Sequence, residues 1–291
     1  MTDLNRRYPG IRWRIAYGSY EGVERFAVNE LQAALQSRLP YVVETVPAAS
    51  VRPGDDVHLA LVGTVRNNRL IAGLLKRLRI APPRGTESYT LLSAASPWRE
   101  SNRIAVMCGA TGRGVLHAVE DFIARIPAPR PGRPARDMCI GLEGGPDFRA
   151  SERPGVKIRG IWTWGYVIYD YRQFIDNMAR LRMNSIIVWN DCPPLNFPEF
   201  ISYARARGIG VIPAFHWGWG TNLDITRHKD RLTIKRDVLR KYSKEYAHLD
   251  VDGIYFQTLT EHDQISLGGR STASLACGLA NLVSAALLEK K

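Results

Sequence analysis

The chain has 291 residues, of which 45% are hydrophobic and 23% are charged, proportions that exclude wholesale disorder and a disulfide-stapled miniprotein. Its length is about twice that of one ordinary domain, so we expect one large or two medium domains. No apolar run approaches the roughly 18 residues that a membrane span needs, and the start lacks the apolar core of a secretory signal. We therefore expect a cytoplasmic protein without a membrane partner. Export stays open if the start is misassigned.

The charge balance is basic, with 40 Lys and Arg against 28 Asp and Glu and a net charge of +12. A nucleic-acid binder would concentrate such an excess on one helix or stripe with aromatic residues between the cations. The densest basic run, at 125–136, contains four prolines and favours an extended linker. We expect no nucleic-acid partner, although binding through the basic surface stays a minor alternative. The charge also suits acidic sugars or other anionic polymers.

The first part of the chain predicts a layered α/β domain over residues 1–126. Its segments alternate between short apolar runs and longer runs whose apolar residues recur every three or four positions. The predicted strands are 11–17, 41–46, 56–63, 88–94 and 102–109, and the predicted helices are 23–39, 67–80 and 114–126. A linker rich in Pro, Arg and Gly follows over residues 127–155.

The second part, residues 156–291, alternates strictly between strand and helix, which favours parallel strands joined by right-handed crossovers. The predicted strands are 160–165, 185–190, 210–217 and 253–259, and the predicted helices are 171–183, 197–208, 237–249 and 275–290. Four βα units are half of a TIM-type (β/α)8 barrel, which typically needs about 250 residues. The inner face would lack opposing strands, so we expect a homodimer through half-barrels, closure of the sheet, or a longer protein.

Functional residues of parallel α/β folds lie at the carboxyl ends of the strands. Tryptophan, His, Asn, Asp and Glu gather there in this sequence, and this combination suits a sugar, whose C–H patches stack on aromatic rings and whose hydroxyls need polar partners. For any single tryptophan, packing in the core is an equal alternative. The predicted sugar-binding residues are Trp162, Trp164, Trp189, Asn190, His216, Trp217, Trp219 and His262.

Glu261 is the predicted general acid. It follows an apolar strand, and apolar neighbours raise the pKa of a carboxyl group toward that of an acid catalyst. Cleavage of a glycosidic bond needs a second carboxylate about 5 to 9.5 Å away, and Asp191 is the best partner in the sequence. The alternatives are a helix-capping or arginine-paired role for Glu261, and a plain turn at Asp191.

The sequence predicts no metal and no cofactor. The histidines lack the spacing of a metal site. Gly109, Gly112 and Gly114 lie between a strand and a helix, as in a nucleotide-binding loop, but no acidic residue follows about 20 positions on. A tight turn that lets the helix pack on the sheet explains these glycines better. The four cysteines lie in or beside apolar stretches, so we expect reduced packing residues.

Several segments resemble a known arrangement, the bacterial-type β-hexosaminidase N-terminal domain followed by a glycosidase barrel, as in glycoside hydrolase families 20 and 67. The run GATGRGVLHAVEDFI is similar to the end of the non-catalytic domain, and Arg159 with Gly160 is similar to the pair that opens the catalytic barrel. DNMARLRMNSIIVWND and YARARGIGVIPAFH are similar to the segments that deliver the second and third strands.

The resemblance implies a glycoside hydrolase that acts on O-glycosidic bonds of a hexosaminide or a glycan containing uronic acid, with Glu261 in the position of the acid. Family 20 enzymes carry Asp-Glu there, and this chain carries Thr260 and Glu261, so the carboxylate that assists the acetamido group is absent. A small hydroxyl residue before the acid is similar to the α-glucuronidases, whose base comes from later strands. The alternative is a non-catalytic or vestigial carbohydrate-binding protein.

Overall fold

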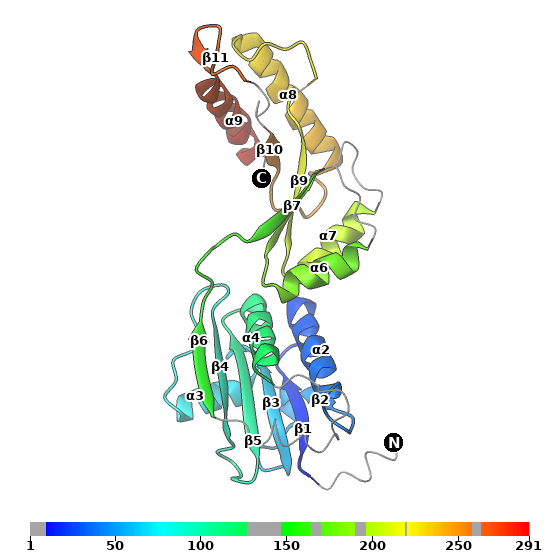
Figure 1. Cartoon of the computed structure of the whole chain (residues 1–291), viewed down its shortest axis with the longest axis vertical. Helices are drawn as coiled ribbons and strands as arrows, with labels where there is room; N and C mark the ends of the chain where they lie inside the picture. Colours follow the sequence, from blue (N-terminus) through cyan, green and yellow to red (C-terminus); the bar gives the residue numbers. More distant parts are fainter. Residues whose placement is uncertain are drawn as a thin grey trace. The chain divides into compact units, whose positions relative to one another are not determined.

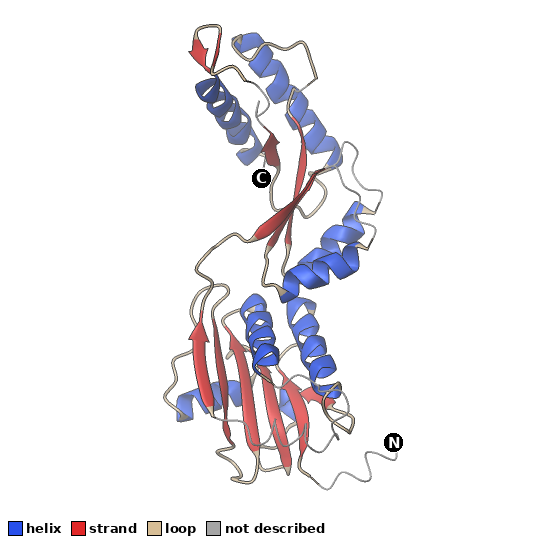
Figure 2. Ribbon diagram, in the orientation of Figure 1, coloured by secondary structure: helices blue, strands red, loops and turns tan. Residues whose placement is uncertain are grey.

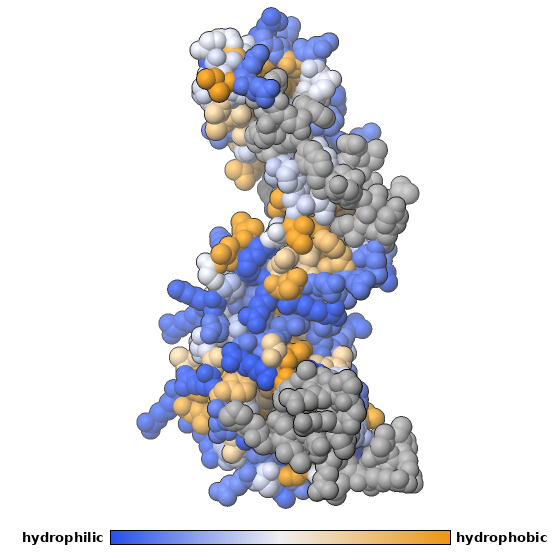
Figure 3. Space-filling model, viewed as in Figure 1, coloured by the Kyte–Doolittle hydropathy of each residue, from blue (hydrophilic) through white to orange (hydrophobic). Residues whose placement is uncertain are grey.

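The computed structural model describes residues 10–126, 147–164, 170–189, 196–218, 220–257 and 263–290, with the backbone alone at 164, 256 and 257. Two compact units divide the chain, Met1–Lys157 with Ala206–Gly208 and Ile158–Arg205 with Ile209–Lys291 (Figure 1). We call them the first and the second unit. No helix among the described residues is long and apolar enough to cross a membrane. In one view, hydrophilic side chains lie between the apolar ones over much of the described surface (Figure 3).

The first unit contains a six-stranded sheet of order β2-β1-β3-β5-β4-β6, in which β4 runs antiparallel to both of its neighbours. The parallel part of the sheet corresponds to four of the predicted strands. Their nearly continuous apolar runs fit a sheet that is buried on both faces. The strands are β1 (Arg12–Tyr17), β2 (Glu44–Pro47), β3 (Val57–Gly63), β4 (Tyr89–Ala95), β5 (Arg103–Gly109) and β6 (Phe148–Glu152).

Helices cover both faces of this sheet, which makes three layers (Figure 2). The helices are α2 (Gly22–Gln36), α3 (Arg69–Arg77) and α4 (Gly112–Arg125), and a short 3-10 turn spans Ala48–Ser50. On one face, Leu61 and Val106 pack in one cluster with Leu74 of α3. Helices α2 and α4 contact each other and lie over the opposite face. Strands β1, β3, β4 and β5 thus send alternate residues into two cores.

Part of the predicted linker is a strand. Residues 127–146 lie outside the described residues, but β6 pairs antiparallel with β4, with Leu91 opposite Ala150. Its short and largely exposed sequence carries little apolar alternation, so the sequence did not indicate it. The pairing covers the backbone edge that β4 would otherwise expose, and the Arg103 to Asp147 ion pair at 2.8 Å adjoins it.

The glycines before α4 serve close packing. A Cβ on Gly109 would meet the backbone of Gly114 and Val115, and a Cβ on Gly114 would meet the carbonyl oxygen of Ser88. Helix α4 can therefore start directly at the end of β5, as the tight-turn interpretation of the sequence expects. Cys108, at the same strand end, is buried, and burial raises the pKa of its thiol to about 12.

The second unit contains a parallel sheet of order β10-β9-β8-β7, so strands adjacent in the chain are adjacent in space. A separate two-stranded hairpin, β11 (Ser266–Leu267) with β12 (Arg270–Ser271), was not predicted. The parallel strands are β7 (Gly160–Trp164), β8 (Ser185–Trp189), β9 (Gly210–His216) and β10 (Tyr255–Gln257). The helices are α6 (Tyr171–Arg180), α7 (Phe197–Arg205), α8 (His228–Glu245) and α9 (Thr272–Leu288).

All four helices of this unit contribute to one apolar cluster on one face of the sheet. Met178 of α6, Ile201 of α7, Val238 of α8 and Leu279 of α9 belong to the same cluster as Phe215 of β9. A doubly wound sheet would carry helices on both faces. Helices on one face of a parallel sheet in sequential order are the arrangement of the first half of a (β/α)8 barrel.

Helix α8 begins nine residues earlier than predicted, at His228 instead of 237. Its first turns contain many charged residues and few apolar ones, so the sequence resembled a polar loop. The start is organised by Asp224, which accepts hydrogen bonds from the backbone N–H and the hydroxyl of Thr226, and these bonds lower the pKa of Asp224. The packing role expected of Cys277 is wrong, because this residue lies on the exposed side of α9.

Candidate functional site

We call the face of β7 to β10 opposite the helices the concave face. One row of residues in register crosses all four strands of this sheet: Trp164 pairs with Trp189, Trp189 with Ala214, and Ala214 with Tyr255. On β8 and β9, Val188 and Phe215 belong to the helix-side cluster. Successive side chains of a strand point to opposite faces, so Trp189 and Ala214 lie on the concave face. In β7 and β8 the residue of this row is the last of the strand, and a parallel α/β fold binds its ligands at the carboxyl ends of its strands.

An aromatic pair lies on the concave face, where the ring of Trp162 on β7 contacts the ring of Tyr255 on β10. The ring centroids are 5.2 Å apart and the planes are tilted by 33°. The Trp162 side chain is 44% exposed. An indole that packs on one neighbour and leaves a large part of its surface in water is a suitable platform for a sugar ring.

Trp189 and His216 are the other predicted site residues that the structure places on the concave face. Trp189 is 6% exposed, so little of its ring is free for stacking, and it acts as part of the floor. His216 is the last residue of β9, is exposed, and stands opposite Gln257 of β10 in register. An exposed imidazole at a strand end can donate or accept hydrogen bonds with a sugar hydroxyl.

Trp217 does not join this group. It is 6% exposed and belongs to the helix-side cluster, together with Ile225 before α8 and Ile234 within it. A Cβ on Gly218 would meet the side chain of Ile234, so the chain passes close to α8 at this point. His216 is the last residue of β9, and Trp217 follows it where the chain approaches α8, so the two side chains lie on different sides of the sheet. Trp217 is therefore a packing residue, and its predicted contact with sugar is not supported.

The predicted catalytic pair and several predicted sugar-binding residues lie outside the described residues. These are Asp191, Glu261, Asn190, Trp219 and His262, together with the side chain of Trp164. Along the chain, Asp191 is two residues beyond Trp189, and Glu261 is four residues beyond Gln257 at the end of β10. Both therefore follow strands whose residues lie on the sheet that carries the concave face.

Tyr255 was not among the predicted sugar-binding residues, although the sequence contains a signal for it. On β10 it follows Ile254, which packs on the helix-side cluster, so the period of two places Tyr255 on the other face. Asp170, another polar residue after β7, has a structural role, because its carboxylate accepts a hydrogen bond of 3.0 Å from the N–H of Gln173 and caps α6.

The described residues contain no group of three or more His, Cys, Asp or Glu side chains that could hold a metal ion. What they bring together is an aromatic pair, a buried indole and an exposed imidazole on one curved surface. Such a surface can bind an amphipathic ring by stacking and hydrogen bonding. The acid and base that bond cleavage requires would have to come from the loops beyond the strands.

Comparison of the fold with solved structures finds glycoside hydrolases. One is a GH138 enzyme targeting pectin rhamnogalacturonan II, with 17% identity and a TM-score of 0.43 over 70% of this chain and 24% of that chain. Another is CpGH84D, with 11% identity and a TM-score of 0.53 over 83% of this chain and 40% of that chain. The chain thus spans less than half the length of either structure. Comparison with models of protein families and with curated proteins finds no match.

The likeness to CpGH84D shows that the chain has a glycoside hydrolase-like fold. The fold class predicted from the sequence, an α/β domain followed by parallel βα units, is confirmed. Assignment to families 20 or 67 stays a prediction.

Proposed function

We propose that the chain is a glycoside hydrolase-like protein whose concave face binds a carbohydrate and in which Glu261 acts as the general acid. The observation that carries this proposal is the half-exposed indole of Trp162 packed against Tyr255 on the concave face of a parallel sheet. Stacked aromatic residues on a concave surface are typical of sugar sites. The glycoside hydrolase-like fold supports the same conclusion.

In this mechanism the sugar ring stacks on Trp162, and His216 hydrogen-bonds a hydroxyl. Glu261 donates its proton to the oxygen of the leaving group as the glycosidic bond breaks. As this bond breaks, Asp191 either attacks the anomeric carbon, giving a glycosyl-enzyme that water hydrolyses with Glu261 as base, or takes a proton from the water that attacks it, depending on the separation of the two carboxyl groups. Thr260 before Glu261 favours a glycan containing uronic acid over an N-acetylhexosaminide, whose acetamido group needs an adjacent carboxylate.

Substitution Glu261→Gln tests the acid role, because it removes the transferable proton and keeps the shape of the side chain. Hydrolysis of natural linkages should fall by at least about 100-fold, and hydrolysis of aryl glycosides with good leaving groups should fall much less, since an activated leaving group needs little protonation. Asp263→Asn is the matched control, because Asp263 is exposed two residues further along the chain. Equal losses on both substrates, or none on either, would exclude Glu261 from this role.

The second candidate function is carbohydrate binding without hydrolysis. It is favoured by the described residues of the concave face, because Trp162, Tyr255 and His216 can stack on and hydrogen-bond a sugar and no carboxylate lies among these described residues. Glycan-array binding measured alongside hydrolysis separates the two functions. Binding without turnover of the bound glycans would support the second candidate.

A further inference from the structure

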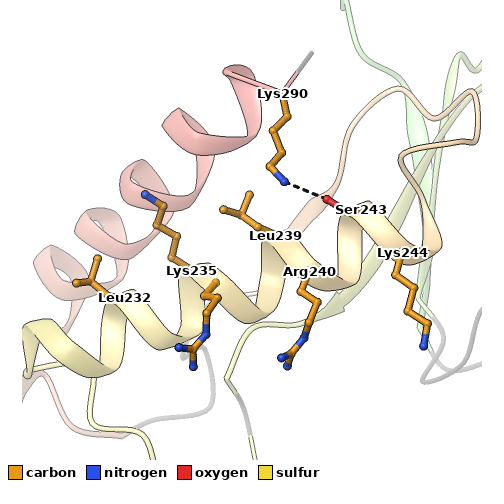
Figure 4. A pocket seen from close by; sticks show the side chains of 8 residues that line it. Leu232, Lys235, Leu239, Arg240, Ser243, Lys244 and Lys290 are labelled. Carbon is orange, nitrogen blue, oxygen red and sulfur yellow. Dashed lines mark hydrogen bonds between the residues drawn. The ribbon is translucent and has the colours of Figure 1, made fainter.

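A basic groove runs along the exposed side of α8 beside the end of α9, and it has a volume of about 720 Å³ (Figure 4). Among the described residues, its lining includes five cations and no carboxylate; the cations are Lys235, Arg236, Arg240, Lys244 and Lys290. Leu232 and Leu239 form its apolar surface. Of these, Leu232 is 42% exposed, so the groove contains apolar surface that water reaches.

The cations of the groove are only partly neutralised. Asp237 pairs with Arg240 at 3.0 Å and with Arg236 at 3.8 Å, and both arginine side chains are more than 70% exposed. Lys235 and Lys244 form no ion pair within the part of the chain that the structure describes. Lys290 donates a hydrogen bond of 3.1 Å to the hydroxyl of Ser243, which holds it at the groove (Figure 4). The surface is thus a strongly positive one.

The spacing of the cations suits an extended anionic chain. Arg236, Arg240 and Lys244 follow one another at four-residue intervals, so they lie on one side of α8 about 6 Å apart along its axis. Successive uronic acid units of such a chain each carry a carboxylate, which a guanidinium or ammonium group of this row can bind through charge-assisted hydrogen bonds.

We propose that this groove on α8 and α9 binds a stretch of an acidic polysaccharide through the carboxylates of its uronic acid units. The choice of polymer rests on the proposed function of the chain, and it names the substrate class as acidic glycans. A single-stranded nucleic acid is the competing polyanion, but its sites combine cations with aromatic rings on which the bases stack. The part of the groove that the structure describes is lined by no aromatic ring.

The test uses polygalacturonate and its fully methyl-esterified form, which share a backbone and differ in charge. Affinities are measured by titration calorimetry for the full chain at two salt concentrations. The groove variant carries Arg236→Gln, Arg240→Gln and Lys244→Gln. The control variant carries Arg66→Gln, Lys76→Gln and Arg77→Gln, three exposed cations of the first unit that give the same change in net charge. All substituted side chains are exposed, and thermal unfolding confirms that both variants fold.

We expect the wild type to bind polygalacturonate, to lose affinity at higher salt, and to bind the methyl ester at least tenfold more weakly. The groove variant should lose about tenfold in affinity, which is about 1.4 kcal/mol for its three exposed ion contacts together, and the control variant should lose less than twofold. Equal losses in the two variants, no loss in the groove variant, or tighter binding of single-stranded DNA than of polygalacturonate would overturn the proposal. The readout is binding, so failure of the proposed hydrolysis appears separately, as absence of turnover.

Discussion

The rings of Trp162 and Tyr255 contact each other, with centroids 5.2 Å apart, although β7 and β10 are the two edge strands of the sheet. Neighbouring strands are about 4.8 Å apart, so the edges of a flat four-stranded sheet would be about 14 Å apart. The contact therefore requires the sheet to curve toward this face. Curvature of this kind, with all helices on the other side, is typical of a barrel wall.

The burial of Trp217 predicts that it stabilises the fold and does not contact sugar. Trp217→Ala should lower the free energy of unfolding of the second unit by about 3 to 5 kcal/mol, because it leaves a large cavity between β9 and α8. Urea unfolding followed by fluorescence measures this change. A variant of normal stability that no longer binds glycans would contradict the assignment.

The close approach of β8 to Gly160 predicts that β7 needs a glycine at its first residue. A Cβ at this position would meet the carbonyl oxygen of Ser185 on β8, so Gly160→Ala must push the paired strands apart. We expect a loss of about 1 to 3 kcal/mol in the free energy of unfolding, typical of overpacking at a tight contact. Gly253→Ala is the control, since nothing lies within 4 Å of a Cβ there. Equal stability of the two variants in thermal unfolding would show that Ser185 can move aside.

The burial of His58 predicts that the folded protein loses stability in mild acid. His58 is 3% exposed, its Nδ1 accepts a hydrogen bond of 2.9 Å from the N–H of Arg103, and burial, followed by the charge of Arg103, lowers its pKa from 6.5 to about 4. The folded state thus holds the neutral imidazole. Its contribution is complete above pH 6.5 and is lost as the pH falls toward 4, by up to about 3 kcal/mol for this residue.

His58→Asn is the variant that tests this pH dependence, because its amide oxygen can accept the same hydrogen bond without titrating. The slope of unfolding free energy against pH between 6.5 and 4 should become shallower in this variant. The exposed His248→Asn should keep the slope of the wild type. An unchanged slope in His58→Asn would assign the acid sensitivity to other groups.

The regular alternation of strand-like and helix-like segments along the sequence made most of the fold predictable. Strands such as Arg103–Gly109 and Gly210–His216 differ from their predicted bounds by one residue, because their apolar runs are bounded by turn residues and have no helical period. Helix α8 was predicted short because its early turns bury little apolar surface, with Ile234 as the first buried residue. Strand β6 was missed because an edge strand needs only backbone hydrogen bonds from its neighbour.

The candidate site was only partly predictable. The sequence placed Trp189 and His216 at strand ends, where the structure has them as the last residues of β8 and β9, since position at a carboxyl end follows from the chain order alone. The face of the sheet to which a side chain points depends on the register within each strand. For this reason Trp217 was placed with the site residues and Tyr255 was not.

The affinity of an oligosaccharide for the wild-type chain and for Trp162→Ala tests most directly whether the concave face is a sugar site. The oligosaccharide is first selected on a glycan array, and its affinity is then measured by calorimetry. The Trp162→Ala variant should lose about 1 to 3 kcal/mol of binding free energy, the scale of a stacked aromatic contact. Tyr20→Ala, which removes an aromatic ring of similar exposure in the first unit, should leave the affinity unchanged. Unchanged affinity in Trp162→Ala, or an equal loss in both variants, would contradict the account.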